Sequence, residues 1–384
     1  MPWYDNFKFL WDNVLQITPQ QAVMYLIGGL LIFLAIKKGL EPALLLPMGF
    51  GAILVNLPNT GVLNWEMPGV GNVNGIIEWL YKIGIEASEA MPVLLFVGIG
   101  AMIDFGPLLT NPKMLLFGAA AQFGIFFTLS VAVLCGFSLQ DAASIGIIGA
   151  ADGPTSILVS QVLKSQYIGA IAVAAYSYMA LVPIIQPFAI KLVTTKEERK
   201  IRMPYNPKKV SRLARILFPI IVTIIAGLIA PSSVALVGML MFGNLLRECL
   251  CLDSLAQTAQ TALANLITIF LGITISFSMK AENFVRWETL MIMGLGLVAF
   301  VFDTIGGVLF AKLINLFCKK ENRINPMVGG AGISAFPMSA RVVQKLGLEA
   351  DNQNHLLMHA IGANVAGQIG SVVAGGIILT MMMR

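Results

Sequence analysis

The feature that most constrains this chain is the repeated occurrence of apolar stretches close to the length that spans a lipid bilayer. About 20 apolar residues cross the hydrocarbon core as a helix. Only 12% of the 384 residues are charged, against about 25% in ordinary soluble proteins. The pattern therefore predicts an all-α polytopic membrane protein. The apolar stretches lie at residues 20–36, 41–57, 91–109, 113–136, 141–163, 167–193, 213–230, 233–247, 258–279, 289–314, 326–346 and 355–381.

Hydropathy and charge divide the chain into four regions. Residues 1–19 mix acids with aromatic side chains, which predicts an amphipathic segment on the membrane surface and no signal peptide. Residues 20–193 and 213–384 each hold six of the apolar stretches, and a basic loop at 194–212 separates them. The net charge of +5 comes largely from that loop, so it indicates membrane orientation and not nucleic-acid binding.

The two apolar regions resemble one another in three places, in the same order. FGAILVN resembles FGNLLRE, and FVGIGAMI resembles FLGITISF. PTSILVSQVL at Pro154 shares five of its ten residues with PMSARVVQKL at Pro337. This order predicts an internal duplication, an organisation that is common in secondary transporters.

Halves that lie inverted in the membrane each need an odd number of crossings. One stretch in each half therefore does not cross, and the glycine- and proline-containing stretches 141–163 and 326–346 are the natural choice. We expect two inverted repeats, with about ten transmembrane helices and two re-entrant, broken-helix hairpins. Lysines and arginines gather on one face of this arrangement, so the positive-inside rule puts loop 194–212 in the cytoplasm and both termini outside.

Each expected hairpin carries residues that interrupt a helix at membrane depth. In the first hairpin Gly149, Gly153 and Pro154 flank Asp152. Backbone that leaves helical geometry in a membrane must be satisfied by protein or by a wet cavity. Such backbone offers carbonyls to a cation and a half-helix N-terminus to an anion. The second hairpin has its interrupting residues at Gly329, Gly330, Gly332 and Pro337.

Asp152 is a functional candidate because an intramembrane acid is costly, although it could instead serve as a structural cap. Asn364 lies in the small-residue segment HAIGANVAGQIGSVVAGG, where it could bind an ion, bond to another helix, or mark close packing. Carboxylate, amide and carbonyl oxygens suit a small hard cation. We therefore expect a Na⁺ site at Asp152, Asn364, Gly149 and Gly153, and a proton-only carrier remains open.

Three motifs carry a resemblance to a known family. GAADGPTSILVSQVL, NPMVGGAGISAFPMSARVVQKLG and LLMHAIGANVAGQIGS resemble the beta subunit of the sodium-translocating biotin-dependent decarboxylases, and the likeness extends over essentially the whole chain. The resemblance implies a subunit of the bacterial cytoplasmic (inner) membrane that decarboxylates carboxybiotin and expels Na⁺ from the cytoplasm, consuming a proton. Carboxybiotin would be carried on a partner subunit.

The resemblance also implies partners and a substrate class. The partners are a carboxyltransferase alpha subunit, a biotin carrier protein and a small single-span membrane subunit, around a homo-oligomeric core. Members act on oxaloacetate, methylmalonyl-CoA, glutaconyl-CoA or malonate. This chain looks most like the acyl-CoA members, in which the alpha subunit selects the substrate.

The family's functional residues fall on seven positions of this chain. Arg341 lies four residues after Pro337, where a guanidinium and a helix N-terminus together suit a carboxylate, unless the side chain snorkels to the interface. Tyr178 could pass a proton to the biotin nitrogen or be a core tyrosine; its neighbour Tyr176 receives no role. The seven positions are Asp152, Tyr178, Asn325, Gly329, Ser334, Arg341 and Asn364. The resemblance implies that Arg341, Asn325, Gly329 and Ser334 bind carboxybiotin. It implies that Arg341, Tyr178, Asn325 and Ser334 are catalytic, and that Asp152 and Asn364 bind Na⁺.

The motifs also fit two other classes of protein, and several further polar residues receive structural interpretations or no role. The same motifs would allow a stand-alone Na⁺-coupled carrier of a small carboxylate, or a structural anchor for a soluble decarboxylase. Cys249-x-Cys251 lacks the spacing of a zinc site, which predicts ordinary helix packing, and His355 with His359 reads as a pair on one helix face. Two further acids have no role, Asp303 within an apolar stretch and Asp104 at an expected helix end.

Overall fold

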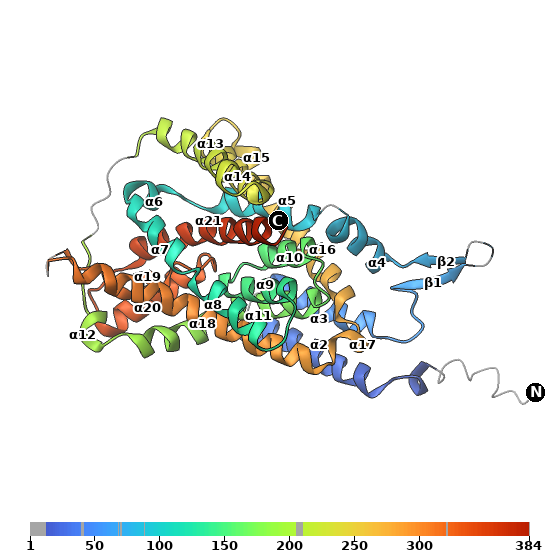
Figure 1. Ribbon diagram of the computed structural model, residues 1–384. Coiled ribbons are helices and arrows are strands. Elements are labelled where there is room, and N and C mark those ends of the chain that lie inside the picture. Colours follow the sequence, from blue (N-terminus) through green and yellow to red (C-terminus); the bar gives the residue numbers. More distant parts are fainter. Residues whose placement is uncertain are drawn as a thin grey trace, which may run out of the picture. The chain divides into compact units, whose positions relative to one another are not determined.

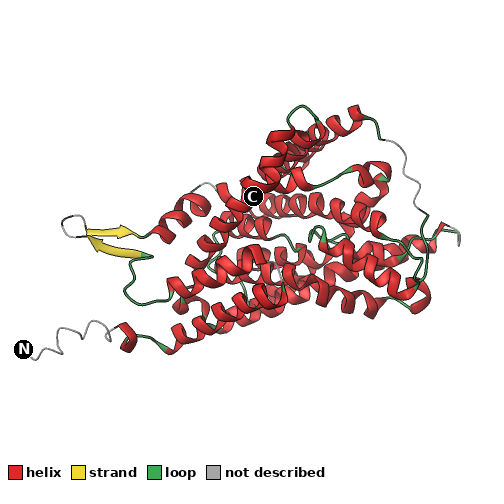
Figure 2. Ribbon diagram, turned by 180° about the vertical axis from the view of Figure 1, so that it is seen from behind, coloured by secondary structure: helices red, strands yellow, loops and turns green. Residues whose placement is uncertain are grey.

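The computed structural model describes residues 13–39, 42–67, 69, 71–87, 89–204, 210–319 and 322–383. Within these ranges the secondary structure is helical apart from one two-stranded hairpin (Figures 1 and 2). Residues 1–12 of the expected amphipathic segment and residues 205–209 of the basic loop lie outside the described part. The described chain divides into two compact units, Met1–Met91 with Asn265–Met291, and Pro92–Ala264 with Ile292–Arg384.

Seven helices of the described residues are long and apolar enough to cross a membrane. An eighth span results if the bent pair Ile76–Glu86 and Ala90–Met102 counts as one. The prediction of a polytopic helical membrane protein is therefore confirmed, while the count of ten crossings stays a prediction. The seven helices are Pro19–Lys38, Pro112–Leu134, Ile168–Val193, Arg212–Ile229, Asp253–Met279, Trp287–Leu316 and Leu357–Met382.

The first unit is built on the helix pair α2 (Pro19–Lys38) and α3 (Pro42–Val55). Thr18 caps α2 by a reciprocal pair of hydrogen bonds with Gln21, which satisfies two of the free amides at the helix start. Gly28 and Gly49 let the two backbones touch, since a Cβ on either residue would lie 2.7 Å from the other's carbonyl oxygen.

Shorter elements complete this unit. Strands β1 (Asn64–Met67) and β2 (Gly71–Asn74) form an antiparallel hairpin in which Trp65 pairs with Val73. The buried Asn56 then joins the end of α3 to the segment that includes η7 and α17, because it donates to Met279 O and accepts from Ala281 N. The other elements are α4 (Ile76–Tyr81), the π-helix η2 (Lys82–Glu86), η7 (Ser276–Met279) and α17 (Ala281–Phe284).

The second unit holds most of the interrupted helices. Three helices contribute residues to both units: α5 (Ala90–Met102), α16 (Ala264–Ile275) and α18 (Trp287–Leu316). The remaining helices are α6 (Gly106–Thr110), η3 (Pro112–Met114), α7 (Leu115–Ala120), α8 (Phe123–Leu134), α9 (Leu139–Gly146), η4 (Ile147–Ala150), α10 (Gly153–Val162), α11 (Ile168–Val193), α12 (Lys196–Arg199), α13 (Arg212–Ile229), η5 (Pro231–Ser233), α14 (Val234–Glu248), α15 (Asp253–Thr258), η6 (Ala259–Leu263), α19 (Pro326–Gly330), α20 (Met338–Ala350) and α21 (Leu357–Met382).

The predicted interruption at Asp152 is confirmed. Helix α9 tightens into the 3₁₀ turn η4 and ends at Ala151, whose φ of 52° is left-handed. Asp152 is extended and begins α10, with Pro154 in its first turn. Proline suits this place because its missing N–H would have no helical partner there.

The second interruption is longer than the first and lies later than predicted. Gly329 and Gly330 belong to the helix α19, so their assignment to the break was wrong. The chain leaves helical geometry between Ala331 and Pro337, and α20 starts at Met338. A stretch of this length exposes more backbone carbonyls than the two-residue break at Asp152.

Two further interruptions fall inside stretches that were expected to be continuous. Stretch 113–136 breaks at Ala121 and Gln122, between α7 and α8, and Asp303 of α18 accepts a hydrogen bond from Ile125 N at the start of α8 (3.1 Å). Stretch 91–109 stops helical geometry at Met102, and Asp104 accepts from Gly106 N (2.8 Å). Asp104 thus lies at a helix end, as the sequence indicated.

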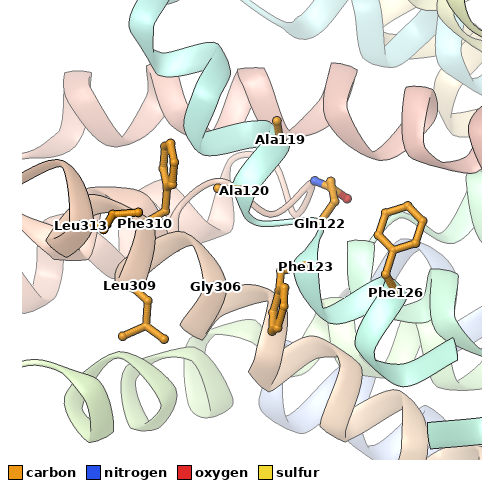
Figure 3. A pocket seen from close by; sticks show the side chains of 9 residues that line it. All are labelled: Ala119, Ala120, Gln122, Phe123, Phe126, Gly306, Leu309, Phe310 and Leu313. Atoms are coloured by element: carbon orange, nitrogen blue, oxygen red, sulfur yellow. The ribbon is translucent and has the colours of Figure 1, made fainter. Parts of the chain in front are cut away.

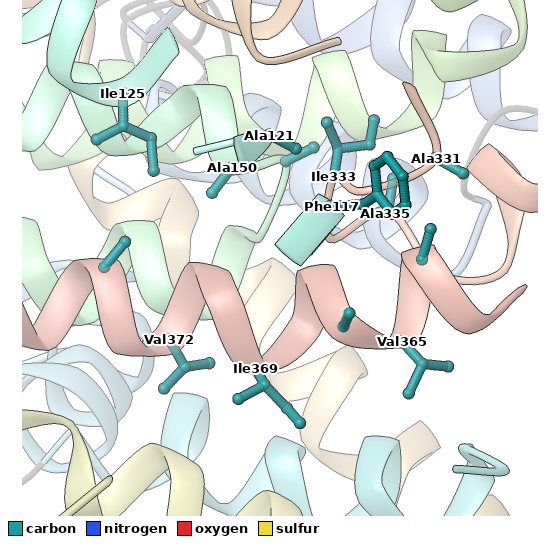
Figure 4. Packing of buried hydrophobic residues seen from close by; sticks show 14 of the residues in the cluster. Phe117, Ala121, Ile125, Ala150, Ala331, Ile333, Ala335, Val365, Ile369 and Val372 are labelled. Carbon is teal, nitrogen blue, oxygen red and sulfur yellow. The ribbon is translucent and has the colours of Figure 1, made fainter. Parts of the chain in front are cut away.

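Helix α21 runs through the core of the second unit. Figure 4 shows Val365, Ile369 and Val372 on this helix, with Ala150 and Ile333 of the two interrupted segments nearby. Small residues let the backbones approach: a Cβ on Gly367 would overlap the backbone of Gly332. The small-residue segment therefore does pack closely, and it lies against both breaks.

Candidate functional site

Asp152 joins three parts of the chain while it is almost completely buried, with 4% of its surface exposed. Its Oδ1 accepts from Thr155 N (3.4 Å), which caps α10. Its Oδ2 accepts from Ser371 Oγ of α21 (2.8 Å) and from Ser334 Oγ of the second break (3.2 Å). Asp152 therefore is a helix cap, which was one of the two interpretations of the sequence, but only its Oδ1 makes the capping bond.

Further hydrogen bonds fix the second break against the first. Ser334 N donates to Ala150 O (3.0 Å), and Gln368 of α21 donates to Ser334 O. The hydroxyls of Ser371 and Ser334 also lie 3.1 Å apart. We call these residues the Asp152 cluster: Asp152, Thr155, Ser334, Gln368 and Ser371. Within the described chain its carboxylate forms no ion pair, so a positive charge bound here would find no competing cation.

Several buried oxygens beside the cluster have no protein partner in the described part of the chain. Asn364 donates its amide to Ile333 O (2.6 Å), and its Oδ1 accepts nothing. Thr155 Oγ1 and the hydroxyl of Tyr176 are likewise without a partner. Buried polar atoms are normally satisfied, so these oxygens, together with one carboxylate, fit a small hard cation.

The two tyrosines of α11 occupy different surroundings. Tyr178 donates its hydroxyl to Met293 O of α18. The ring of Tyr176 lies directly against Gly153, where a Cβ would overlap it, and Tyr176 is fully buried. The structure therefore puts Tyr176, to which the sequence gave no role, beside the Asp152 break. Tyr178, the expected proton donor, is bonded to α18.

The two glycines assigned to the first break have distinct neighbours. Gly153 opens α10 beneath Tyr176. Gly149 lies in η4 and faces Asp303, whose Oδ2 would be 2.5 Å from a Cβ at this position. Asp303 is fully buried, and this oxygen has no hydrogen-bond partner among the described residues.

Asn325 and Gly329 lie apart from the Asp152 cluster. Asn325 is buried and caps α19, and its amide donates to the carbonyls of Arg199 (3.0 Å) and Ile201 (2.8 Å) in the basic loop. Gly329 packs against the backbone of Gly307 on α18. Asn325 therefore anchors a loop, and Gly329 permits close helix packing.

Arg341 also lies apart from the cluster. Its side chain is exposed, in the first turns of α20. It lines an open pocket of about 510 Å³ with Gln344, Lys345, Leu348, Glu349 and Leu357. Of the predicted residues, the structure thus brings together Asp152, Ser334 and Asn364, with Gly153 adjacent, and leaves Arg341 accessible to a ligand from solvent.

Four residues of the site were missed. Gln368 and Ser371 lie four and seven residues after Asn364, so all three share one face of α21, and this spacing was visible. Thr155 occupies the position that a capping aspartate bonds. Tyr176 had no such signal, because only the fold shows which tyrosine faces Gly153.

A separate pocket among the described residues lies elsewhere. It has a volume of about 640 Å³ and follows the break between α7 and α8, along α18 (Figure 3). Phe123, Phe126, Leu309 and Phe310 give it an apolar lining, with Gln122 at the break. None of the predicted site residues lines this pocket.

Fold and site together define a polytopic helical membrane protein whose interrupted helices meet at a buried carboxylate, an arrangement typical of ion-coupled membrane proteins. The family model described as "Na⁺-transporting oxaloacetate decarboxylase beta subunit" matches residues 20–382. The chain therefore belongs to the family of beta subunits of sodium-translocating decarboxylases.

Curated relatives agree with this assignment. The chain is 50% identical to a glutaconyl-CoA decarboxylase subunit beta of Acidaminococcus fermentans, covering 97% of this chain and 94% of the relative. It is 49% identical to a methylmalonyl-CoA decarboxylase subunit beta of Propionigenium modestum, covering 94% of each. It is 46% identical to a probable oxaloacetate decarboxylase beta chain of Vibrio cholerae, covering 94% and 95%.

Proposed function

We propose that this subunit decarboxylates carboxybiotin presented on a partner protein, and that it couples the release of CO₂ to Na⁺ export from the cytoplasm while consuming a proton. The observation that supports this most is the position of Asp152. Its carboxylate is hydrogen-bonded to Ser334 in the second break and to Ser371 on α21. A movement of either break therefore changes the surroundings of the same carboxylate.

The Na⁺ site comprises Asp152, Asn364 and the backbone around Gly149 and Gly153. The structure adds the hydroxyls of Ser334 and Ser371 as candidate ligands. One carboxylate neutralises one monovalent cation, which lowers the cost of holding that ion in a buried site. Asn364 Oδ1 can coordinate this cation, because no protein group among the described residues donates a hydrogen bond to this oxygen.

Carboxybiotin binds at Arg341, and Asn325, Gly329 and Ser334 complete its binding site. Arg341 is exposed beside an open pocket, so a group tethered to a soluble carrier can reach it. Ser334 belongs to the Asp152 cluster and lies seven residues before Arg341. Losing the carboxylate as CO₂ removes an anion from this segment, and the bound Na⁺ is then held less tightly, which is the differential binding that coupling requires.

Tyr178 supplies the proton that the reaction consumes. Its phenol is the proton donor for the biotin nitrogen as CO₂ leaves. In this structure the hydroxyl is bound to Met293 O. Proton transfer therefore belongs to a state in which this hydrogen bond is released.

The membrane arrangement follows two inverted repeats, 20–193 and 213–384, with ten crossings and two re-entrant hairpins. The matched positions Pro154 and Pro337 support it, since both lie where a half-helix starts after a break. Loop 194–212 faces the cytoplasm, and the subunit resides in the inner membrane of a bacterium.

The complex contains a carboxyltransferase alpha subunit, a biotin carrier protein and a small single-span subunit, around several copies of this chain. An acyl-CoA substrate, methylmalonyl-CoA or glutaconyl-CoA, is favoured. The supporting relatives named for these substrates are 49% and 50% identical, against 46% for the oxaloacetate relative.

A stand-alone Na⁺-coupled carboxylate carrier is the alternative, and purification separates the two. Affinity-purified chain should bring down a biotinylated protein, and the assembly should decarboxylate in proportion to Na⁺. Arg341→Lys should slow decarboxylation steeply, because an ammonium lacks the planar fork of donors. The control Lys345→Arg in the same pocket should have little effect. No biotinylated partner, with Na⁺-driven uptake of a carboxylate by the chain alone, would establish the carrier instead.

A further inference from the structure

Asp303 is a buried acid in α18 to which the proposed function assigns no role. Its Oδ1 accepts from Ile125 N (3.1 Å) near the start of α8, next to the break between α7 and α8. Its Oδ2 has no hydrogen-bond partner among the described residues, and it lies close to Gly149 of η4, the turn that precedes Asp152. The carboxyl group of Asp303 therefore lies between two interrupted segments of the second unit.

The described surroundings of Asp303 contain no charge that would balance a carboxylate. The segments packed against α18 around this residue, 115–134, 147–150 and 326–330, have no ionisable side chain. Along α18 the nearest ionisable residues are Glu288 and Lys312, and Lys312 pairs with Glu198 (3.0 Å). Burying a carboxylate without a cation costs far more free energy than burying the neutral acid. The site therefore favours either a proton or a bound cation on Asp303.

The oxygens that suit a metal ion gather at Asp152 and not at Asp303. Around Asp152 lie the hydroxyls of Ser334 and Ser371. Beside Asp303 Oδ2, the other atoms closest to the Cβ position of Gly149 are carbon atoms of Ala299. A hard cation is held by several oxygens, whereas a single unbonded carboxyl oxygen is enough to hold a proton. This contrast favours a proton on Asp303.

An open pocket comes within one helical turn of this acid. The pocket of about 640 Å³ along α7, α8 and α18 has Gln122, Phe123 and Gly306 in its lining (Figure 3). Gly306 lies three residues after Asp303 on α18, and a Cβ on Gly306 would be 2.9 Å from Cβ of Phe123. One turn of a helix rises about 5.4 Å, so a small apolar molecule in this pocket would be close to the carboxyl group.

We propose that Asp303 is a proton-binding site, with the proton on Oδ2 and the hydrogen bond from Ile125 N on Oδ1. The ionised form would need a hydrogen-bond donor or a water molecule at Oδ2, and Gly149 of η4 lies against that oxygen. Release of the proton therefore requires η4 to move, and η4 leads directly to Asp152. The inference follows from the surroundings of Asp303 and does not depend on the proposed Na⁺ and carboxybiotin sites.

Infrared difference spectroscopy of the full chain in detergent at neutral pH tests for this proton. The spectrum of wild type minus Asp303→Asn should contain the C=O stretch of a protonated carboxylic acid, and added Na⁺ should leave this band unchanged. After transfer to D₂O the band should keep its position for longer than the mixing time, because η4 covers Oδ2. Asp104→Asn is the matched control. Asp104 is half-buried and faces Arg215 (3.7 Å), so its difference spectrum should show an ionised carboxylate.

A second measurement uses only the wild-type chain and so does not depend on the folding of a variant. Dicyclohexylcarbodiimide is apolar and reacts with protonated carboxyl groups: the acid proton passes to a nitrogen of the reagent, and the carboxyl oxygen bonds to its central carbon. Peptide mapping should find several-fold more of this adduct on Asp303 than on Asp104, with no protection by Na⁺.

Three results would overturn the proposal. One is an ionised carboxylate in the Asp303→Asn difference spectrum. Another is a protonated band that disappears, or a carbodiimide reaction that slows, when Na⁺ is added, since Asp303 would then bind a metal cation. The third is carbodiimide modification of Asp303 no greater than that of Asp104.

Discussion

At the scale of single residues, Asp152 divides two tasks between its two oxygens. Oδ1 completes the start of α10 through Thr155 N, and Oδ2 receives the hydroxyls of Ser334 and Ser371. The helix N-terminus favours a negative charge at this position. The same carboxylate therefore caps a helix and joins three distant parts of the chain. The sequence had offered the cap and a functional role as alternatives.

Ser371 offers a direct test of the hydroxyl ligands. Ser371→Ala removes an oxygen next to the carboxylate, and hydrogen bonds to charged groups contribute about 1.5–3 kcal/mol. We expect the Na⁺ concentration for half-maximal decarboxylation to rise roughly tenfold or more. Ser160→Ala is the matched control, since the hydroxyl of this buried serine donates to Ser156 O in its own helix (2.7 Å). An equal effect in both variants would exclude a specific role for Ser371.

The tyrosines separate ion binding from proton transfer. Tyr176→Phe should weaken Na⁺ activation with a smaller effect on the maximal rate, because Tyr176 lies against Gly153 beside Asp152. Tyr178→Phe should lower the maximal rate and leave Na⁺ activation nearly unchanged. Steady-state rates measured over a Na⁺ series distinguish the two, and the reverse pattern would exchange the roles assigned here.

At the scale of secondary-structure elements, glycine and proline made two of the breaks predictable, because their backbone preferences act locally. The break at Gln122 has no such signal. It is held by Asp303, whose bond to Ile125 N joins residues 178 positions apart. Likewise, the side chain of Arg341 lines an open pocket, and the sequence alone could not decide between a carboxylate site and a side chain that snorkels to the interface.

Close backbone contact between α21 and the second break predicts a sharp steric effect. Gly367→Ala would press a methyl group onto Gly332, and overpacking costs about 1–3 kcal/mol. We expect a lower thermal unfolding midpoint in detergent and weaker Na⁺ activation, since Ser334 follows Gly332 closely. Gly294→Ala on α18 is the control, because no atom lies within 4 Å of the added methyl. Equal midpoints for the two variants would contradict this contact.

At the scale of the whole molecule, composition and apolar length were enough to predict the membrane class. They could not show how the basic loop is held. Residues 194–204 are fastened through Arg199 O, which accepts from both Asn325 and Asn354, and through the pair Lys312–Glu198 (3.0 Å). These partners lie more than a hundred residues away in sequence, so a charged linker and an anchored loop look alike in the sequence.

The inverted topology makes its own prediction. Cysteine introduced at Lys200 should react with a membrane-impermeant maleimide only from the cytoplasmic side, because the positive-inside rule places the basic loop there. Cysteine introduced at Glu86 should react only from the outside. Labelling of both positions from the same side would rule out the inverted arrangement.

Na⁺ transport by the assembled complex in proteoliposomes tests directly whether the carboxylate of Asp152 binds the transported ion. Asp152→Asn removes the charge but keeps the cap, since asparagine caps helices as well as aspartate does. We expect this variant to assemble but to lose both Na⁺ transport and Na⁺-dependent decarboxylation, while Asp104→Asn at a half-buried helix end retains both. Na⁺ transport at the normal rate by Asp152→Asn would show that the transported ion binds elsewhere.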